Sequence, residues 1–210
     1  DLRRQRAQVV AVGITIMLGV GLFIASAGAF DNLSGSYQHT YDRLHFADLF
    51  STGGDPAKIA AAGASAGADA TQVRLQVDPP MLIDGTKLLG RVIGMPADAQ
   101  PGVNDVQITE GDYLSSSDPD GVIVETHAAE TFGLHPGDTL QVYTTTGWRT
   151  VTVRGVAVSA EYIWPARSRQ EVLGDPHSFA VVFASESSVE SWAGTGPNQA
   201  NVRSMIQRWR

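Results

Sequence analysis

The pattern of apolar and polar positions begins with one long apolar run near the N-terminus. Residues 9–30, VVAVGITIMLGVGLFIASAGAF, carry no charge, and Thr15 and Ser26 are their only strongly polar side chains. At about 1.5 Å of rise per residue, such a run can cross a hydrocarbon core of about 30 Å as a helix. Arginines precede the run and Asp31 follows it, so the positive-inside rule places the N-terminus in the cytoplasm. The pattern predicts a transmembrane helix with everything after Phe30 outside.

A cleaved signal peptide is the competing interpretation of the same residues. The sequence RRQR at residues 3–6 resembles the basic start of a signal peptide, and ASAGAF at residues 25–30 offers small residues for cleavage. The apolar run is longer than the about 7–15 residues usual for the core of a signal peptide, which favours a permanent anchor. Both interpretations export the rest of the chain.

The helical pattern continues beyond the predicted membrane segment. Leu33, Tyr37, Tyr41 and Leu44 follow one another at intervals of four, four and three residues, which is the spacing of one apolar helical face. The spacing predicts that the membrane helix extends outward as a stalk over residues 31–44.

After the stalk, the periodicity predicts strand, helix, strand and strand. HFADLFS at residues 45–51 is strand-like, and Asp55 followed by Pro56 should begin an Ala-rich helix that ends near Ala66. Further predicted elements are the strands ATQVRLQVD and KLLGRVIGM, the turn region PPMLIDG between them, the late strand HSFAVVFAS and a helix over residues 186–193. Together these elements predict a βαββαβ layer.

Residues 103–165 have a different pattern of apolar and turn-forming residues. They consist of short β runs separated by Gly, Pro and Asp turns, with one short helix near HAAETFG. This region should form a compact β-rich unit inserted into the layer. The predicted fold class is therefore α+β, with one N-terminal transmembrane helix and an interrupted βαββαβ layer.

Charge and composition narrow the possible partners. The 210 residues are 43% hydrophobic and 18% charged, contain no cysteine and have a formal net charge of −7. Residues 31–202 carry 9 basic and 21 acidic side chains, a net −12. An acidic surface repels phosphate groups, so nucleic acid is not an expected partner. Thiolate metal sites and disulfides are excluded.

Few residues suggest catalytic chemistry. GASAG at residues 63–67 matches the nucleophile-elbow pattern around Ser65, but that serine must follow a strand, and here a helix precedes it. Glu125, His127 and Glu130 are interpreted as solvated charges at a helix flank. The sequence contains no G-x-x-x-x-G-K-[ST] loop for nucleotides and no H-E-x-x-H metal motif. We therefore assign no catalytic, cofactor-binding or metal-binding residue and do not expect an enzyme.

The order of several motifs resembles a known family. YDRLHFADLF after the membrane helix is followed by GRVIGMP, TEGDYL, ETHAAETFGLHPGDTLQV, VTVRGVAVSAEYIW and HSFAVVFAS. This succession covers most of residues 1–190 and is similar to the extracytoplasmic core region of FtsX/MacB-type ABC transporter permeases. The resemblance implies a porter-like α/β subdomain interrupted by a β-rich, sabre-like subdomain. It also implies a bacterial cell membrane, a cytoplasmic ABC ATPase subunit and, as a further candidate partner, a second permease copy.

This resemblance gives each part of the chain an expected role. The expected ranges are a cytoplasmic segment 1–8, a transmembrane helix 9–30, a stalk helix 31–44, a porter-like subdomain 45–102 and 176–206, a sabre-like subdomain 103–165, and a connecting loop 166–175. The implied function is to couple cytoplasmic ATP hydrolysis to export or extraction of a lipid, lipoprotein or peptide.

The sequence also departs from the family pattern. It starts at Asp1, and after WAGTGP it becomes basic and ends at Arg210 without the further membrane helices of a permease. We expect a fragment of a longer permease. The alternative is a single-pass, membrane-anchored binding or sensor module, and a third interpretation, a secreted hydrolase, depends on Ser65.

Overall fold

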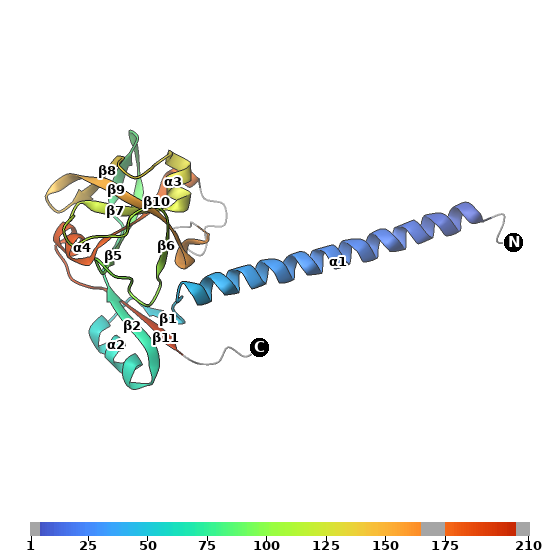
Figure 1. Cartoon of the computed structure of the whole chain (residues 1–210), viewed down its shortest axis with the longest axis horizontal. Helices are drawn as coiled ribbons and strands as arrows, with labels where there is room; N and C mark the ends of the chain where they lie inside the picture. Colours follow the sequence, from blue (N-terminus) through green and yellow to red (C-terminus); the bar gives the residue numbers. More distant parts are fainter. Residues whose placement is uncertain (1–4, 165–174, 205–210) are drawn as a thin grey trace. The chain divides into compact units, whose positions relative to one another are not determined.

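The computed structural model describes residues 5–164 and 175–204, and the chain divides into two compact units, residues 1–43 and 44–210 (Figure 1). Most of the connecting loop expected at 166–175 lies outside the described residues, as do the first four residues of the expected cytoplasmic segment.

The first unit is a single helix, α1 (Arg6–Arg43), of 38 residues. Its membrane-spanning candidate, Gln8–Arg43, has a mean hydropathy of 2.4 in its most apolar window, and no other described helix is long and apolar enough to cross a membrane. Thr15 donates its hydroxyl to the Ala11 carbonyl at 2.9 Å, which satisfies this polar group within the helix. The predicted transmembrane helix and stalk are therefore one continuous helix that Gly35 does not interrupt.

The second unit contains a three-stranded antiparallel sheet, which we call the small sheet, with strands in the order β1-β11-β2. A helix, α2, packs against it, because Gly63 of α2 lies close to the Val202 side chain. The elements are β1 (Leu49–Ser51), α2 (Pro56–Ser65), β2 (Ala68–Arg74) and β11 (Gln199–Ser204). Asp55 caps α2 by accepting the backbone N–H groups of Ala57 and Lys58, as its position before Pro56 predicts.

The second sheet has eight strands in the described part of the chain. Six of them follow the order β10-β7-β9-β8-β4-β5, and β5 pairs again with β10, so the sheet closes into a barrel. Strand β3 lies beside β5, and β6 lies beside β9. The bounds are β3 (Gln76–Val77), β4 (Pro80–Ile83), β5 (Thr86–Met95), β6 (Val106–Gly111), β7 (Gly121–Glu125), β8 (Thr139–Thr144), β9 (Gly147–Ser159) and β10 (Phe179–Ser185).

Short helical elements connect these strands. They are α3 (Thr126–Phe132), α4 (Glu186–Ala193) and the 3₁₀ turns η1 (Ala160–Tyr162) and η2 (Pro176–Ser178). Ser185 caps α4 by accepting the Ser188 N–H at 3.2 Å. Gly133 and Gly194 end α3 and α4 in the left-handed conformation, which glycine adopts without a steric penalty.

Two clusters of buried apolar side chains form the core of the larger sheet. Alternate residues of β10 belong to different clusters: Val182 and Ala184 to the first, and Val181 and Phe183 to the second. All residues of β7 and β10 are buried, so these strands are covered on both faces, which explains their nearly continuous apolar sequence.

The predicted single βαββαβ layer is wrong in its strand arrangement. Strands β5 and β10 were expected in one layer with β1 and β2, but they pair with each other in the larger sheet. Because β10 is apolar on both faces, it requires a central position, with β5 on one side and β7 on the other. PPMLIDG, expected to be only a turn, contains β4.

The structure also differs from the expected start of the first strand and from the expected separation of the inserted unit. The strand expected from residue 45 begins only at Leu49, because His45 has a positive φ of 52°. Strands of the expected insertion, residues 103–165, pair with flanking strands: β7 with β10, and β8 with β4. The boundaries of porter-like and sabre-like subdomains thus remain a prediction. The helices expected from Pro56 and over residues 186–193 are confirmed.

Candidate functional site at the start of the folded domain

The chain enters the second unit through five residues, Leu44 to Asp48, which we call the junction segment. Helix α1 ends at Arg43, and His45 then adopts a left-handed conformation with φ 52°, which a helix interior does not permit. Leu44 and Ala47 are buried. The junction segment is therefore a turn anchored in the domain by its own apolar side chains.

One side of the junction segment is bonded to the loop that precedes β6. The N–H groups of Asp105 and Asn104 donate to the carbonyls of Leu44 and His45, both at 2.9 Å. The Ala47 N–H donates to Asn104 Oδ1 at 2.7 Å, and His45 Nδ1 lies 2.7 Å from Asp105 Oδ2. Asn104 has a φ of 56°, a conformation that asparagine tolerates better than most residues.

The loop before β6 is itself fixed. Asp105 Oδ1 accepts the Gly102 N–H at 2.8 Å. The Gln100 side chain accepts the Val106 N–H at 3.1 Å and donates to the Val106 carbonyl at 2.8 Å. These contacts hold residues 100–106, which bond to the junction segment, in one arrangement.

The other side of the junction segment is bonded to the small sheet. The Asp48 N–H donates to the Val202 carbonyl at 3.0 Å, and Asp48 Oδ2 accepts the Ser204 N–H at 2.9 Å. The chain then continues into β1, where Leu49 pairs with Val202. A displacement of the junction segment would thus act on the small sheet and on the loop leading into β6.

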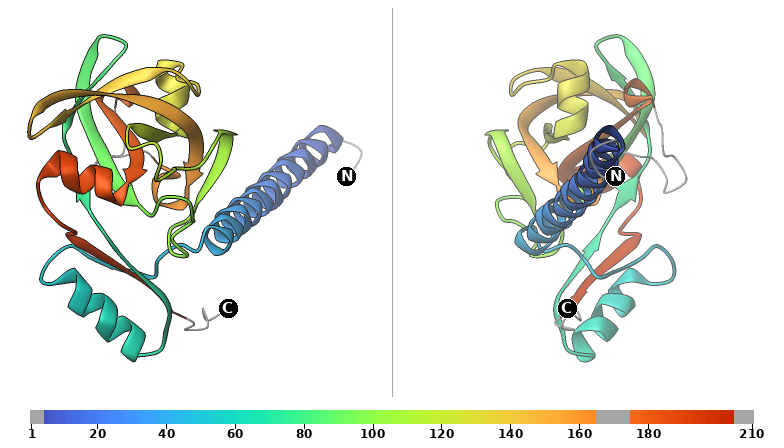
Figure 2. Two further views of the ribbon diagram at one scale, coloured as in Figure 1. Left: turned by 60° about the vertical axis from the view of Figure 1, so that its left-hand side comes forward. Right: turned by 90° about the vertical axis from the view of Figure 1, so that its right-hand side faces the viewer.

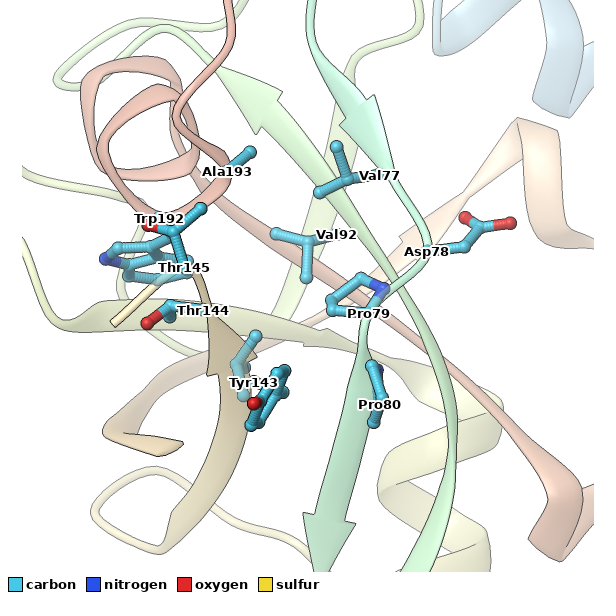
Figure 3. Close-up of a pocket in the computed structure, with 11 residues that line it drawn as sticks. Val77, Asp78, Pro79, Pro80, Val92, Tyr143, Thr144, Thr145, Trp192 and Ala193 are labelled. Atoms are coloured by element: carbon cyan, nitrogen blue, oxygen red, sulfur yellow. The ribbon is translucent and has the colours of Figure 1, made fainter. Parts of the chain in front are cut away.

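A groove of about 380 Å³ lies where β8 and α4 end (Figure 3). Pairing between β4 and β8 is limited to Met81 with Val142 and Leu82 with Gln141. Prolines have no N–H to donate, so Pro79 and Pro80 end this pairing and leave the groove open. The lining residues are mostly apolar: Val77, Asp78, Pro79, Pro80, Val92, Val142, Tyr143, Thr144, Thr145, Trp192 and Ala193.

Among the described residues that line the groove, Asp78 alone is charged, and its carboxylate is paired. Arg91 donates through Nε and Nη2 to the two Asp78 oxygens, both at 2.8 Å. These contacts raise the pKa of Arg91. In Figure 3 the Asp78 side chain points away from the groove, toward which Val92, Tyr143 and Trp192 extend. The groove suits an uncharged, apolar group.

The structure does not support a nucleophile at Ser65. This residue is the last of α2, and its hydroxyl donates to the Ala61 carbonyl at 2.8 Å. A nucleophile elbow would place the serine between a strand and a following helix. Ser65 instead satisfies a carbonyl near the end of α2.

The expected helix-flank charges are only partly solvated. Glu130 is exposed, but Glu125 is buried and caps α3 by accepting the His127 N–H at 2.8 Å. Burial raises the pKa of Glu125, although the nearby His127 ring opposes this effect. Nowhere in residues 5–164 and 175–204 do three or more His, Asp or Glu side chains gather as a metal site would require.

The sequence predicts that the stalk ends at Leu44 and that a strand-like segment follows, but it does not indicate the partners of this segment. Asn104 and Asp105 lie 57 and 60 residues beyond the groups that they contact, and no local pattern connects them. The only available signal was the turn-forming sequence GVND, which is compatible with a left-handed asparagine.

Taken together, the described residues combine one helix that is long and apolar enough to cross a membrane with a β-rich α/β domain. The chain belongs to the family of MacB-like periplasmic core domains, whose model matches residues 10–194. The predicted relationship to FtsX/MacB-type ABC transporter permeases is thereby confirmed. No curated protein matches the chain.

Two solved structures are similar to this chain at low identity. The periplasmic region of MacB from Actinobacillus actinomycetemcomitans is 11% identical, with a TM-score of 0.44 over 76% of this chain and 75% of that one. The extracellular domain of the noncanonic ABC-type transporter YknZ from Gram-positive bacteria is 11% identical, with a TM-score of 0.44 over 67% of each chain. The family assignment depends on the family model and not on these likenesses.

Proposed function

We propose that this chain supplies the first membrane helix and the extracytoplasmic core domain of an ABC transporter permease. Its N-terminus lies in the cytoplasm, and residues after about 30 lie outside the membrane. The domain couples ATP hydrolysis by a cytoplasmic ATPase subunit to export or extraction of a lipid, lipoprotein or peptide. Membership of the MacB-like family supports this proposal.

The observation that carries the proposal is the continuity from α1 into the junction segment. At about 1.5 Å per residue, the 38 residues of α1 extend about 57 Å, nearly twice the thickness of a hydrocarbon core. Leu44 follows α1 directly and is bonded to the loop before β6. A stiff helix joined to a hydrogen-bonded segment can transmit a movement that a flexible linker would absorb.

The energy for such a movement has to come from another subunit. The sequence has no G-x-x-x-x-G-K-[ST] loop for a nucleotide, and three arginines lie before the apolar run, where the positive-inside rule places them in the cytoplasm. An ATPase that binds on that side, together with further permease helices or a second permease copy, would complete the transporter.

Interrupting α1 between the membrane and the junction segment tests this coupling. In proteoliposomes that contain the complete permease and its ATPase, Tyr37→Pro should reduce substrate export at least about tenfold while ATP hydrolysis continues. Proline removes a helical hydrogen bond and kinks the helix at a cost of about 3 kcal/mol or more. Export and ATP hydrolysis are measured in the same vesicles.

Tyr37→Ala is the matched control, because it removes the same exposed side chain and keeps the helix. It should leave export unchanged. Export by the Tyr37→Pro variant at the rate of the unmodified protein would show that α1 does not transmit movement.

The second candidate is a membrane-anchored binding module, which the apolar groove beside Trp192 favours. An anchor has only to span the membrane, so this function predicts that Tyr37→Pro changes nothing. The same experiment therefore distinguishes the two functions.

A further inference from the structure

The small sheet and the barrel do not share an apolar core. Neither of the two apolar clusters contains a residue from β1, α2, β2 or β11. The small sheet buries only a few apolar side chains of its own, among them Ala60, Ala200 and Val202. Parts of a protein that are not joined by a large apolar interface are expected to move relative to each other unless other contacts hold them.

Two chain segments cross from the small sheet to the larger sheet next to each other. One passes from the end of β2 through Leu75 into β3, and the other passes through Asn198 into the start of β11. Asn198 ties them together: its N–H donates to the Arg74 carbonyl at 3.1 Å, its Oδ1 accepts the Gln76 N–H at 3.0 Å, and its Nδ2 donates to the Gln76 carbonyl at 2.8 Å. These three hydrogen bonds hold the two segments together. Figure 2 shows that they form the narrow connection between the part with α2 and the barrel.

A buried arginine spans this connection. Arg74, at the end of β2, is 2% exposed and donates through Nη1 and Nη2 to the two Glu161 carboxylate oxygens at 2.7 and 2.6 Å. Its Nε donates to Gln199 Oε1 at 2.5 Å. Glu161 belongs to η1, which directly follows β9 of the barrel. The guanidinium thus holds both crossing segments against one turn of the barrel.

Arg74 is charged despite its burial. Burial disfavours the charged form of Arg74, but its contacts with Glu161 outweigh this effect, and the pKa of Arg74 is raised. Apolar residues of similar size often replace a buried ion pair without loss of stability. A two-pronged contact between a guanidinium and a carboxylate does require one specific geometry, so it fixes an orientation that apolar packing would leave adjustable.

We propose that the small sheet is hinged on the barrel at residues 74–76 and 198–199, and that the Arg74–Glu161 ion pair is the latch that holds the hinge in the observed orientation. The junction segment is bonded to both sides of this hinge, through Asp48 to the small sheet and through Leu44 to the loop before β6. The hinge is a property of the folded domain and does not depend on the coupling function.

A distance measurement across the hinge tests the latch. The chain has no cysteine, so Ala61→Cys on α2 and Thr150→Cys on β9, both at exposed positions, give a unique pair of spin labels. In the full chain in detergent micelles, the double-labelled protein should show one narrow distance distribution. With Arg74→Met added, we expect a second distance that accounts for on the order of a tenth of the molecules or more.

Arg149→Met is the control, because Arg149 pairs with Asp120 at 2.5 Å and both residues belong to the barrel. This variant should leave the distance distribution unchanged. An Arg74→Met protein that keeps its tryptophan fluorescence and shows the original narrow distribution would overturn the proposal.

A milder variant covers the case in which Arg74→Met does not fold. Glu161→Gln removes the charge and preserves the shape of the side chain, so it should broaden the distribution less than Arg74→Met does. Loss of the native fluorescence of Trp192, which is buried in the first apolar cluster, in both variants would contradict a latch, because opening a hinge leaves the barrel folded.

Discussion

The barrel and the small sheet of the second unit are held by different forces. The barrel closes on itself, and its strands β7 and β10 are buried along their whole length. The small sheet has three strands, and directional polar contacts around Arg74 and Asn198 attach it to the barrel. Apolar burial stabilises without specifying direction, whereas ion pairs and hydrogen bonds specify a geometry and add little net stability. In this domain, stability and orientation are therefore provided by separate groups.

The largest expected effect of a substitution on the free energy of unfolding is in the barrel. Phe183 is 1% exposed in the second apolar cluster, so Phe183→Ala should lower the free energy of unfolding by about 3–5 kcal/mol. Val202→Ala in the small sheet removes two methyl groups at a 7% exposed position and should cost about 1–2 kcal/mol. Urea titrations followed by tryptophan fluorescence measure both values. Equal losses would show that the small sheet contributes to one common core.

A smaller effect is expected at the junction segment. Asn104→Ala removes the acceptor for the Ala47 N–H and places alanine at a φ of 56°, so it should cost about 1–3 kcal/mol. Asn104→Gly permits the backbone conformation and removes only the side chain, so it should cost less. Hydrogen exchange at the Ala47 amide should accelerate in both variants. Unchanged exchange in Asn104→Ala would mean that the loop before β6 does not hold the junction segment.

The smallest effect concerns an exposed ion pair on the barrel. Glu110 Oε2 lies 3.0 Å from His135 Nδ1, and this hydrogen bond raises the pKa of His135 above its usual 6.5. A raised histidine pKa adds stability below pH 6.5 that is lost as the pH rises through the folded-state pKa. Glu110→Gln should lower the pKa of His135, measured by NMR titration, and leave the urea midpoint unchanged because the pair is exposed. A large change in the midpoint would contradict the distinction between exposed and buried pairs.

Elements with local start signals could be predicted from the sequence. Asp55 and Pro56 correctly marked the start of α2, and the helix that begins at Glu186 was predicted with its observed bounds. These signals act within one turn of helix, so a short stretch of sequence contains them completely. The long helix α1 was predictable for the same reason, because apolar periodicity is a local property.

Strand pairing and the contacts of the candidate site could not be predicted in this way. The apolar sequence of β10 is compatible with any buried strand, and it does not indicate that β5 and β7 are its pairing partners. Arg74 and Glu161 are 87 residues apart, and in the sequence neither can be distinguished from an ordinary surface charge. Their roles arise only when the barrel brings the end of β2 next to η1, which is a consequence of topology and not of local preference.

The parallel pairing of β5 with β10 has a consequence for how the domain is made. Leu89 pairs with Phe179, 90 residues later in the chain, so one side of β5 has no partner until β10 has been synthesised. Pairing between distant segments forms slowly, and an unpaired strand edge is prone to aggregation. During synthesis the nascent chain must keep this edge protected, and folding of the barrel can be completed only near the end of the described sequence. Any factor that assists folding of the barrel is therefore expected to act after β10 has been synthesised.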